Sequence, residues 1–185
     1  MPPQKTKPPT WTDLKKVVND LDHSQMVDLI RDLYRLSNSN SDFLHTRFSM
    51  GKDPIGPYKE IIKHAMYPEY EERETIEISR ARKAISDYSK ASDDLKSKID
   101  LMIFFVECGN RFTLDYGDID EEFYTSLCRM YYKAAENVLL LPEQEQKEFH
   151  QRLKRIMESS LGMGWGYHDD LCDTYYEAFP DELDE

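Results

Sequence analysis

Apolar residues recur at the spacing of an α-helix along most of this chain. Over residues 14–21, and again over residues 26–33, they follow the i, i+3, i+4, i+7 pattern of one helix face. Asp22 stands between these stretches with Gln25 three positions later, an arrangement typical of a capping box that starts the second helix. We expect these two amphipathic helices to form a hairpin.

Glycine, proline and short polar residues interrupt the helical pattern further along the chain. The Ser/Asn run at residues 37–41 predicts a break, which is followed by a short helix over Phe43–Phe48. Glycines and prolines at residues 51–57 end that helix, and another short helix is expected over Tyr58–Met66. An acidic linker over Glu69–Glu74 then leads to a more regular second half.

The centre of this second half is a helix that begins at a cap over Ser92–Asp94 and runs to about Thr113. It is apolar on all sides over Leu101–Val106, which is typical of a helix surrounded by others. One helix precedes it, and Asp120 and Pro142 mark the starts of the next two before a last helix. The positions expected to face the core are Ile78, Ala81, Ala84, Ile85, Tyr88, Phe123, Leu127, Met130, Tyr131, Ala134, Val138, Phe149, Leu153, Ile156, Leu171, Cys172, Tyr175 and Phe179.

Short connections between successive helices predict an all-α fold, a bundle of antiparallel helical hairpins that is similar to a helical repeat. No stretch has the period-2 alternation of a strand. One helical domain is expected over residues 11–179, made of an N-terminal hairpin region at 11–50 and a main bundle at 54–179. The proline-rich residues 1–10 are expected to be a disordered tail, and residues 180–185 an acidic tail.

The charge balance narrows the classes of partner. The 185 residues include 36 acidic and 24 basic ones, for a net charge of −12. This charge favours solubility and argues against direct binding of nucleic acid. Two basic clusters, at residues 80–83 and 152–155, are interpreted as solvated helix faces, with a local basic patch as the alternative.

The remaining composition indicates a cytoplasmic protein without metal or cofactor. Cys108, Cys128 and Cys172 lie far apart and suggest neither a disulfide framework nor a zinc ribbon, which favours a reducing compartment. The start has no apolar signal segment, and the longest apolar run is far shorter than the roughly 20 residues of a membrane span. The acidic cluster at residues 115–122 lacks the spacing of a calcium-binding EF-hand loop, and no nucleotide, zinc-protease or hydrolase motif is present.

Gly162–Asp170 is the most unusual segment, because three glycines and Trp165 occupy five consecutive positions directly before a helix. Such a turn often shapes a site, and Trp165, His168 and Asp169 are its candidate ligand-binding residues. His168 and Cys172 are four positions apart and could both bind a metal, but no third ligand has a matching local spacing. A histidine hydrogen-bonded into the core is the favoured interpretation.

Glu107 directly follows the apolar run, so its carboxylate is expected to be partly buried and to need a partner. Arg111, four residues later, is the expected partner in an internal ion pair. In the alternative, Glu107 is a general base beside His168, in a pocket that Arg111, Trp165 and Asp169 help to line. The sequence leaves both alternatives open.

The chain contains twelve tyrosines, including the pairs 131–132 and 175–176 on predicted helices. One member of each pair is expected to face inward. Tyr132 and Tyr176 are then candidates for partner binding, because amphipathic rings at a surface are frequent in binding hot spots. The alternative is that the tyrosines complete the core and keep only their hydroxyls in water.

Three blocks of sequence carry a resemblance to a known family. They are Ile78–Ile85, Val106–Thr113 with its continuation Tyr116–Ile119, and Gly164–Leu171. With the order of segments over Leu14–Phe179, they resemble an uncharacterised bacterial family of domain-of-unknown-function proteins of similar length. The resemblance implies an all-helical fold and implies no activity, catalytic residue or cofactor.

Absent catalytic motifs and abundant aromatic residues favour a non-enzymatic protein-interaction or accessory domain in the bacterial cytoplasm, with another protein as its partner. One alternative is an enzyme, or a small-ligand or metal-binding domain, with a pocket at the Gly162–Asp170 turn and the helix of Glu107. A second alternative is an acidic inhibitor of a nucleic-acid-binding protein, suggested by the net charge.

Overall fold

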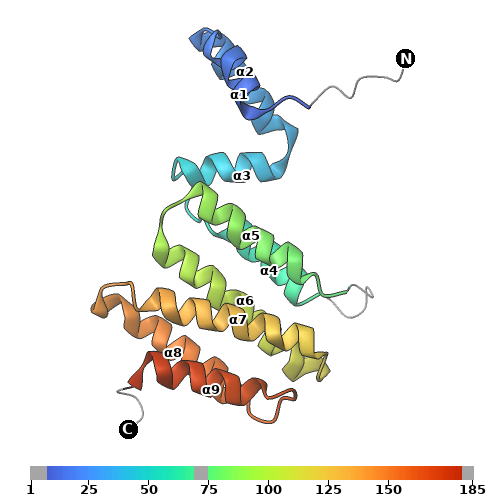
Figure 1. Ribbon diagram of the computed structural model, residues 1–185, viewed down its shortest axis with the longest axis vertical. Helices are drawn as coiled ribbons and strands as arrows, with labels where there is room; N and C mark the ends of the chain where they lie inside the picture. The colour runs from blue at the N-terminus through green and yellow to red at the C-terminus, as the bar shows by residue number, and fades with distance from the viewer. Residues whose placement is uncertain (1–7, 69–74, 181–185) are drawn as a thin grey trace. The chain divides into compact units, whose positions relative to one another are not determined.

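The computed structural model describes residues 8–68 and 75–180, and its regular elements are α-helices, with no strand among these residues (Figure 1). This confirms the predicted all-α class. The chain divides into two compact units, Met1–Leu44 and His45–Glu185, which we describe separately. The expected linker at 69–74 and most of both expected tails lie outside the described residues.

The first unit contains α1 (Trp11–Asn19), α2 (His23–Leu36) and the start of α3 (Asn38–Arg47). The predicted capping box of α2 is present. The Asp22 side chain accepts a hydrogen bond from the Gln25 N–H at 2.9 Å, and the Gln25 side chain accepts one from the Asp22 N–H at 2.9 Å. These reciprocal bonds satisfy backbone donors that a helix start otherwise leaves without partners.

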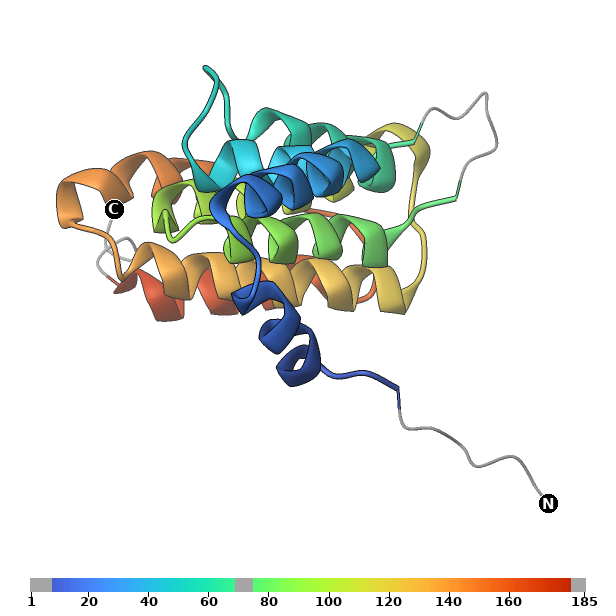
Figure 2. The same ribbon diagram turned by 90° about the horizontal axis from the view of Figure 1, so that it is seen from above.

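Neither α1 nor α2 buries a side chain. The two helices diverge from their connecting turn (Figure 2), so the close hairpin packing expected from the sequence is not seen between them. α3 begins at Asn38, earlier than the predicted Phe43. The Ser/Asn run starts this helix because the Ser37 hydroxyl accepts a bond from the Asn40 N–H at 3.2 Å, which caps the first turn.

The second unit is a stack of three helix pairs. Figures 1 and 2 show α5, α7 and α9 in one layer and α4, α6 and α8 in the other. Within the described residues, no helix combines the length and apolar character needed to cross a bilayer. The helices of this unit are α4 (Gly56–Met66), α5 (Ile78–Ala91), α6 (Leu95–Tyr116), α7 (Glu121–Val138), α8 (Glu143–Ser159) and α9 (Tyr167–Ala178).

α6 is the central helix, as its all-apolar segment predicts, and it packs against α4, α5, α7 and α8. The Asp94 side chain caps its start by accepting a bond from the Ser97 N–H at 3.3 Å. The positions predicted to face the core of the main bundle are buried, except that Ile78 and Cys172 are half-buried. The 3.6-residue period therefore identified the inner face of each helix.

Candidate functional site

Apolar side chains lie exposed along both α1 and α2. Their exposed fractions range from 37% at Leu29 to 75% at Leu36. Exposed apolar side chains that gather in one region of a protein mark interaction sites, because water disfavours apolar surface. We call this set of side chains the N-terminal apolar face, and it consists of Trp11, Leu14, Val17, Val27, Leu29, Ile30, Leu33, Tyr34 and Leu36.

Local bonds stabilise these helices in place of a core. Besides the cap at Asp22, the Asp13 carboxylate accepts a bond from the Thr10 N–H at 3.0 Å, and this backbone bond lowers the pKa of Asp13. Arg31 pairs with Asp28 at 2.8 Å on the polar side of α2. Helices of 9 and 14 residues are marginal in water without tertiary packing. The face is therefore the side on which α1 and α2 could gain that packing.

The ion pair predicted between Glu107 and Arg111 is wrong. Both Glu107 carboxylate oxygens accept bonds from Arg152 of α8, one from Nε at 2.8 Å and one from Nη2 at 2.8 Å. Arg111 is instead exposed and pairs with Asp115 at 2.6 Å, one turn further along α6. Glu107 lies on the side of α6 that meets α8, and a planar guanidinium can hold a carboxylate by two parallel bonds.

Arg152 also joins Glu107 to a larger ion cluster. Its Nη1 donates to Asp100 at 2.6 Å, and the second Asp100 oxygen lies 2.7 Å from Nζ of Lys59 on α4. Burial alone would raise the pKa of Asp100, but hydrogen bonds from Lys59 and Arg152 outweigh burial and lower it. Two carboxylates thus share two cations, which connects α4, α6 and α8 and supports a structural role for Glu107.

The glycine turn does not bury its tryptophan. Trp165 is 58% exposed and has a φ of +61°, a left-handed conformation that is rare for bulky residues. Gly164 approaches Asp118 so closely that a Cβ would lie 3.0 Å from a carboxylate oxygen. The Asp118 carboxylate accepts bonds from the Gly164 N–H at 3.2 Å and the Tyr124 hydroxyl at 2.5 Å. Asp118, which the sequence placed only in an acidic cluster, therefore anchors the turn to the α6–α7 connection.

His168 is hydrogen-bonded into the second unit. Its Nδ1 lies 2.9 Å from the Ser160 hydroxyl and 3.1 Å from the Met157 carbonyl, and its Nε2 lies 3.5 Å from Sγ of Cys172. The Ser160 hydroxyl donates to the Met157 carbonyl at 2.6 Å, so Nδ1 carries the imidazole proton and Nε2 accepts from the thiol. Burial raises the pKa of Cys172 and keeps that thiol protonated. Among the described residues, no group of three or more His, Cys, Asp or Glu side chains is placed to hold a metal ion.

Glu107 and Arg111 line a pocket of about 180 Å³ between α6 and α8. None of its lining residues comes from the turn that carries Trp165, His168 and Asp169. The structure therefore brings Glu107 and Arg111 to one cavity and does not bring the other three predicted residues to it.

The two tyrosine pairs each turn one ring inward. Tyr131 and Tyr175 are fully buried. Tyr132 is exposed, and its hydroxyl donates to Glu136 at 2.7 Å. Tyr176 is half-buried, with its ring edge-on to Tyr175 at 5.5 Å between centroids. Partner binding by Tyr132 and Tyr176 stays a prediction.

These features define an all-α protein that presents an apolar helical face at its N-terminal end. The family model described as a family of unknown function, DUF6155, matches residues 10–180, and the chain belongs to this family. Searches of curated proteins and of solved structures found no match. Membership in this family agrees with the resemblance seen in the sequence and with the all-helical fold. Because the family has no known function, membership assigns no activity to this chain.

Proposed function

We propose that this chain is a non-enzymatic protein-interaction domain that acts in the cytoplasm and whose N-terminal apolar face is covered by another protein. The observation that carries the proposal is the exposure of this face on two helices that bury no side chain of their own. An exposed apolar surface of this kind gains free energy when a partner removes it from water.

The free energy gained by burying apolar side chains of α2 shows how this helix could contribute to the contact. Full burial of one leucine or isoleucine contributes roughly 1.5–3 kcal/mol. Leu29, Ile30 and Leu33 follow the i, i+1, i+4 spacing of one α2 face and are each exposed by 37–46%. Amphipathic helices that dock into a partner's groove use anchors of this spacing. Because each is less than half exposed, covering all three would contribute roughly 2–4 kcal/mol and offset part of the entropy lost on association.

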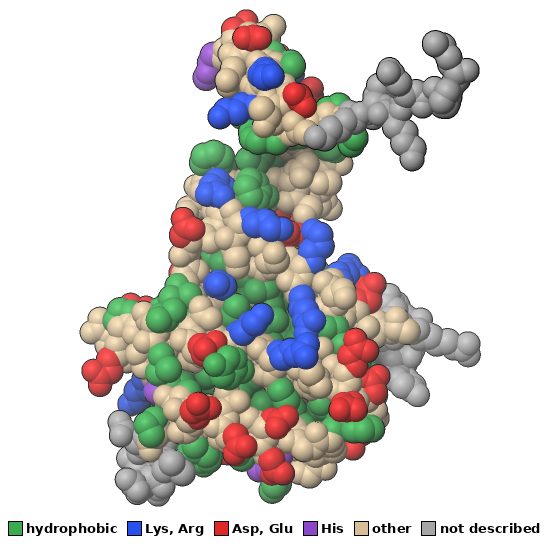
Figure 3. Space-filling model, in the orientation of Figure 1, with side chains coloured by type: hydrophobic (Ala, Val, Ile, Leu, Met, Phe, Trp, Pro, Cys, Tyr) green, Lys and Arg blue, Asp and Glu red, His purple; other side chains and the backbone are tan. Residues whose placement is uncertain are grey.

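The two alternative functions receive less support from the described contacts. Arg152 occupies both oxygens of the Glu107 carboxylate, and the pocket between α6 and α8 that Glu107 lines includes no residue of the turn that carries His168, so the two groups do not act together on a substrate there. The first 44 residues contain as many acidic as basic residues, so the net charge of −12 belongs to residues 45–185. Figure 3 shows Lys and Arg gathered in the middle of one face, which is unlike a uniformly acidic inhibitor.

Affinity capture of the full chain at its native expression level, with a photo-crosslinker at Leu36, tests this function. The test variant is Ile30→Asp with Leu33→Asp, and the control is Arg31→Gln with Arg35→Gln. Both make the charge of α2 more negative by the same amount, but the control alters only its polar side. All four side chains are exposed, and circular dichroism of both variants checks that α2 keeps the same helix content in the test variant and in the control.

We expect a stoichiometric partner that crosslinks to α2, is retained by the control and is reduced at least tenfold in the test variant. A chain that is captured without any partner would contradict the proposal. Equal loss of the partner in both variants would also contradict it, because the apolar side chains would then not be the contact.

A further inference from the structure

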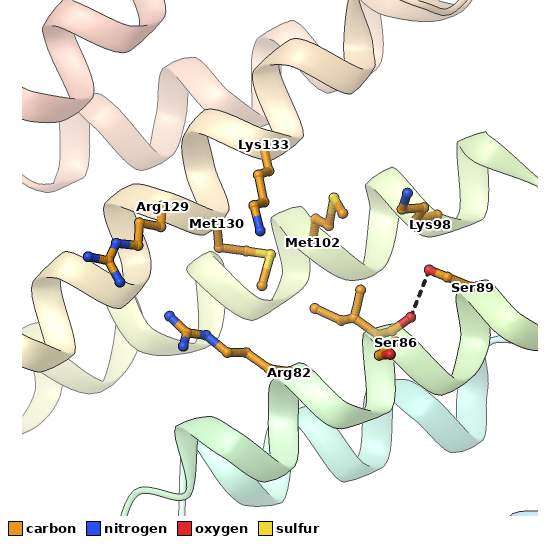
Figure 4. Close-up of a pocket in the computed structure, with 9 residues that line it drawn as sticks. Arg82, Ser86, Ser89, Lys98, Met102, Arg129, Met130 and Lys133 are labelled. Atoms are coloured by element: carbon orange, nitrogen blue, oxygen red, sulfur yellow. Dashed lines mark hydrogen bonds between the residues drawn. The ribbon is translucent and has the colours of Figure 1, made fainter.

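A groove opens between α5 and α7, with α6 as its floor (Figure 4). Both α5 and α7 pack on α6, but they are not closely packed on each other. In the same layer, α7 and α9 are packed directly against each other. The groove has a volume of about 420 Å³, which lies within the range of small-molecule sites.

Four basic side chains line this groove, and no carboxylate does. They are Arg82 of α5, Lys98 of α6, and Arg129 and Lys133 of α7. Within the described part of the chain, none of the four forms an ion pair. By contrast, Lys83 lies next to Arg82 in sequence and pairs with Asp87. A chain with a net charge of −12 thus leaves four cations at one groove without a counter-charge from the described residues.

This arrangement carries a repulsion that an anionic ligand would relieve. Arg129 and Lys133 are four residues apart on α7, and like charges at this spacing repel each other. Figure 4 shows Arg82 and Lys133 reaching toward the groove from opposite walls. Guanidinium groups bind phosphate by paired hydrogen bonds, and an ammonium group adds a point charge. A multiply charged anion would relieve the repulsion and satisfy these donors.

The floor of the groove adds an apolar surface. Ile85, Met102 and Met130 are buried beneath the charged rim. Methionine side chains are flexible and polarisable, and they adapt well to flat rings. The Ser89 hydroxyl on the α5 wall donates to the Ile85 carbonyl at 2.9 Å, and its oxygen can still accept a bond.

We propose that this groove binds a small organic polyphosphate. Arg82, Arg129 and Lys133 hold the phosphate groups, and the ring or chain of the ligand lies on Met102 and Met130. The inference is independent of the N-terminal apolar face, because the lining residues belong to α5, α6 and α7.

Titration calorimetry of the full chain with three probes tests the two halves of this ligand. ATP carries both a polyphosphate and a ring, inorganic triphosphate carries only the charge, and adenosine carries only the ring. At low salt we expect ATP to bind at least threefold more tightly than triphosphate, and adenosine to show no binding. Binding should weaken as salt rises, because the phosphate contacts are screened.

The variant Arg82→Gln with Lys133→Gln should weaken ATP binding at least tenfold. Its matched control, Lys147→Gln with Arg155→Gln, removes the same two charges from exposed positions on α8, outside the groove. Methyl NMR then locates the ligand, since the Met102 and Met130 methyl resonances should shift with ATP and that of the buried Met157 on α8 should not.

Several outcomes would overturn the proposal. They are no binding of ATP at low salt, equal weakening in the groove variant and the α8 control, or ATP-induced shifts that spare Met102 and Met130. Equal affinity for ATP and triphosphate would show that the ring of the ligand contributes nothing, so the groove would bind only the phosphate groups. Binding of polyglutamate in place of ATP would assign the groove to an acidic polypeptide instead.

Discussion

Replacing Gly109 with alanine tests how tightly α6 and α7 are packed. Gly109 lies inside α6, where a glycine ordinarily weakens a helix by about 1 kcal/mol relative to alanine. Helix propensity alone therefore predicts that Gly109→Ala stabilises the protein. The packing against α7 predicts the opposite.

The structure allows the two effects to be compared. A Cβ at position 109 would lie 2.5 Å and 3.0 Å from the two δ-carbons of Leu127, and 3.2 Å from Cζ of Phe123. Leu127 is fully buried and Phe123 is 2% exposed, so neither side chain can move into solvent. Overpacking of this kind costs about 1–3 kcal/mol. Because two side chains resist the added methyl group, we take the upper part of that range and expect a net loss of about 1–2 kcal/mol.

Urea unfolding followed by circular dichroism at 222 nm measures this loss, and the melting temperature should fall by roughly 3–6 °C. The double variant Gly109→Ala with Leu127→Ala gives a sharper test. Leu127→Ala alone leaves a cavity and costs about 2–5 kcal/mol. The methyl group added at position 109 would occupy part of that cavity, so the double variant should be more stable than the summed effects by at least about 1 kcal/mol. A stabilised single variant, or simple additivity, would refute the close contact between α6 and α7.

Three further predictions concern the second unit. Trp165→Ala should cost less than about 1 kcal/mol in urea unfolding because the ring is exposed, and Trp165→Gly should be about 1 kcal/mol more stable than the alanine variant because φ is +61°. Tyr167→Phe should be neutral or stabilising by up to about 1 kcal/mol, because the buried Tyr167 hydroxyl has no hydrogen-bond partner among the described residues; a clear loss of stability would show that a partner exists. Arg152→Ala should cost about 3 kcal/mol at pH 7, because it leaves Glu107 and Asp100 without their shared partner. The pKa of Asp100 is lowered from 3.8 in the folded state, so its stabilisation is complete above that value and is lost as the pH falls through the lower folded value. The Arg152→Ala deficit should therefore shrink in unfolding curves below about pH 4, and a deficit independent of pH would count against the ion cluster.

The sequence predicted the second unit well because each of its helices has one buried side. Periodicity located Ala81 and Leu153 correctly, and side-chain caps such as Asp120, which accepts a bond from the Phe123 N–H at 2.8 Å, marked the helix starts. α3 was missed in part because a Ser/Asn run favours turns by composition, while its actual role as a cap depends on the bond at Ser37.

Contacts between distant segments could not be predicted from the sequence. Glu107 has Arg111 four residues away and Arg152 on another helix, and only the arrangement of α6 against α8 decides between them. The same holds for Asp118, whose partners Gly164 and Tyr124 come from different segments. For the groove, the sequence contained a partial indication, because Arg82 belongs to a basic cluster at residues 80–83. That residues of α7 line the same groove can be seen only in the structure.

Three features of this chain oppose its own stability. The N-terminal apolar face exposes leucines, valines and aromatic rings to water, four cations share one groove, and Trp165 holds a left-handed conformation with its ring exposed. The well-packed core of α4–α9 shows that the sequence is otherwise consistent with its fold. Departures from local rules that the rest of a structure tolerates are concentrated at functional sites. An interaction partner would reverse the first cost and an anion the second, so binding at either surface should raise the melting temperature of the chain.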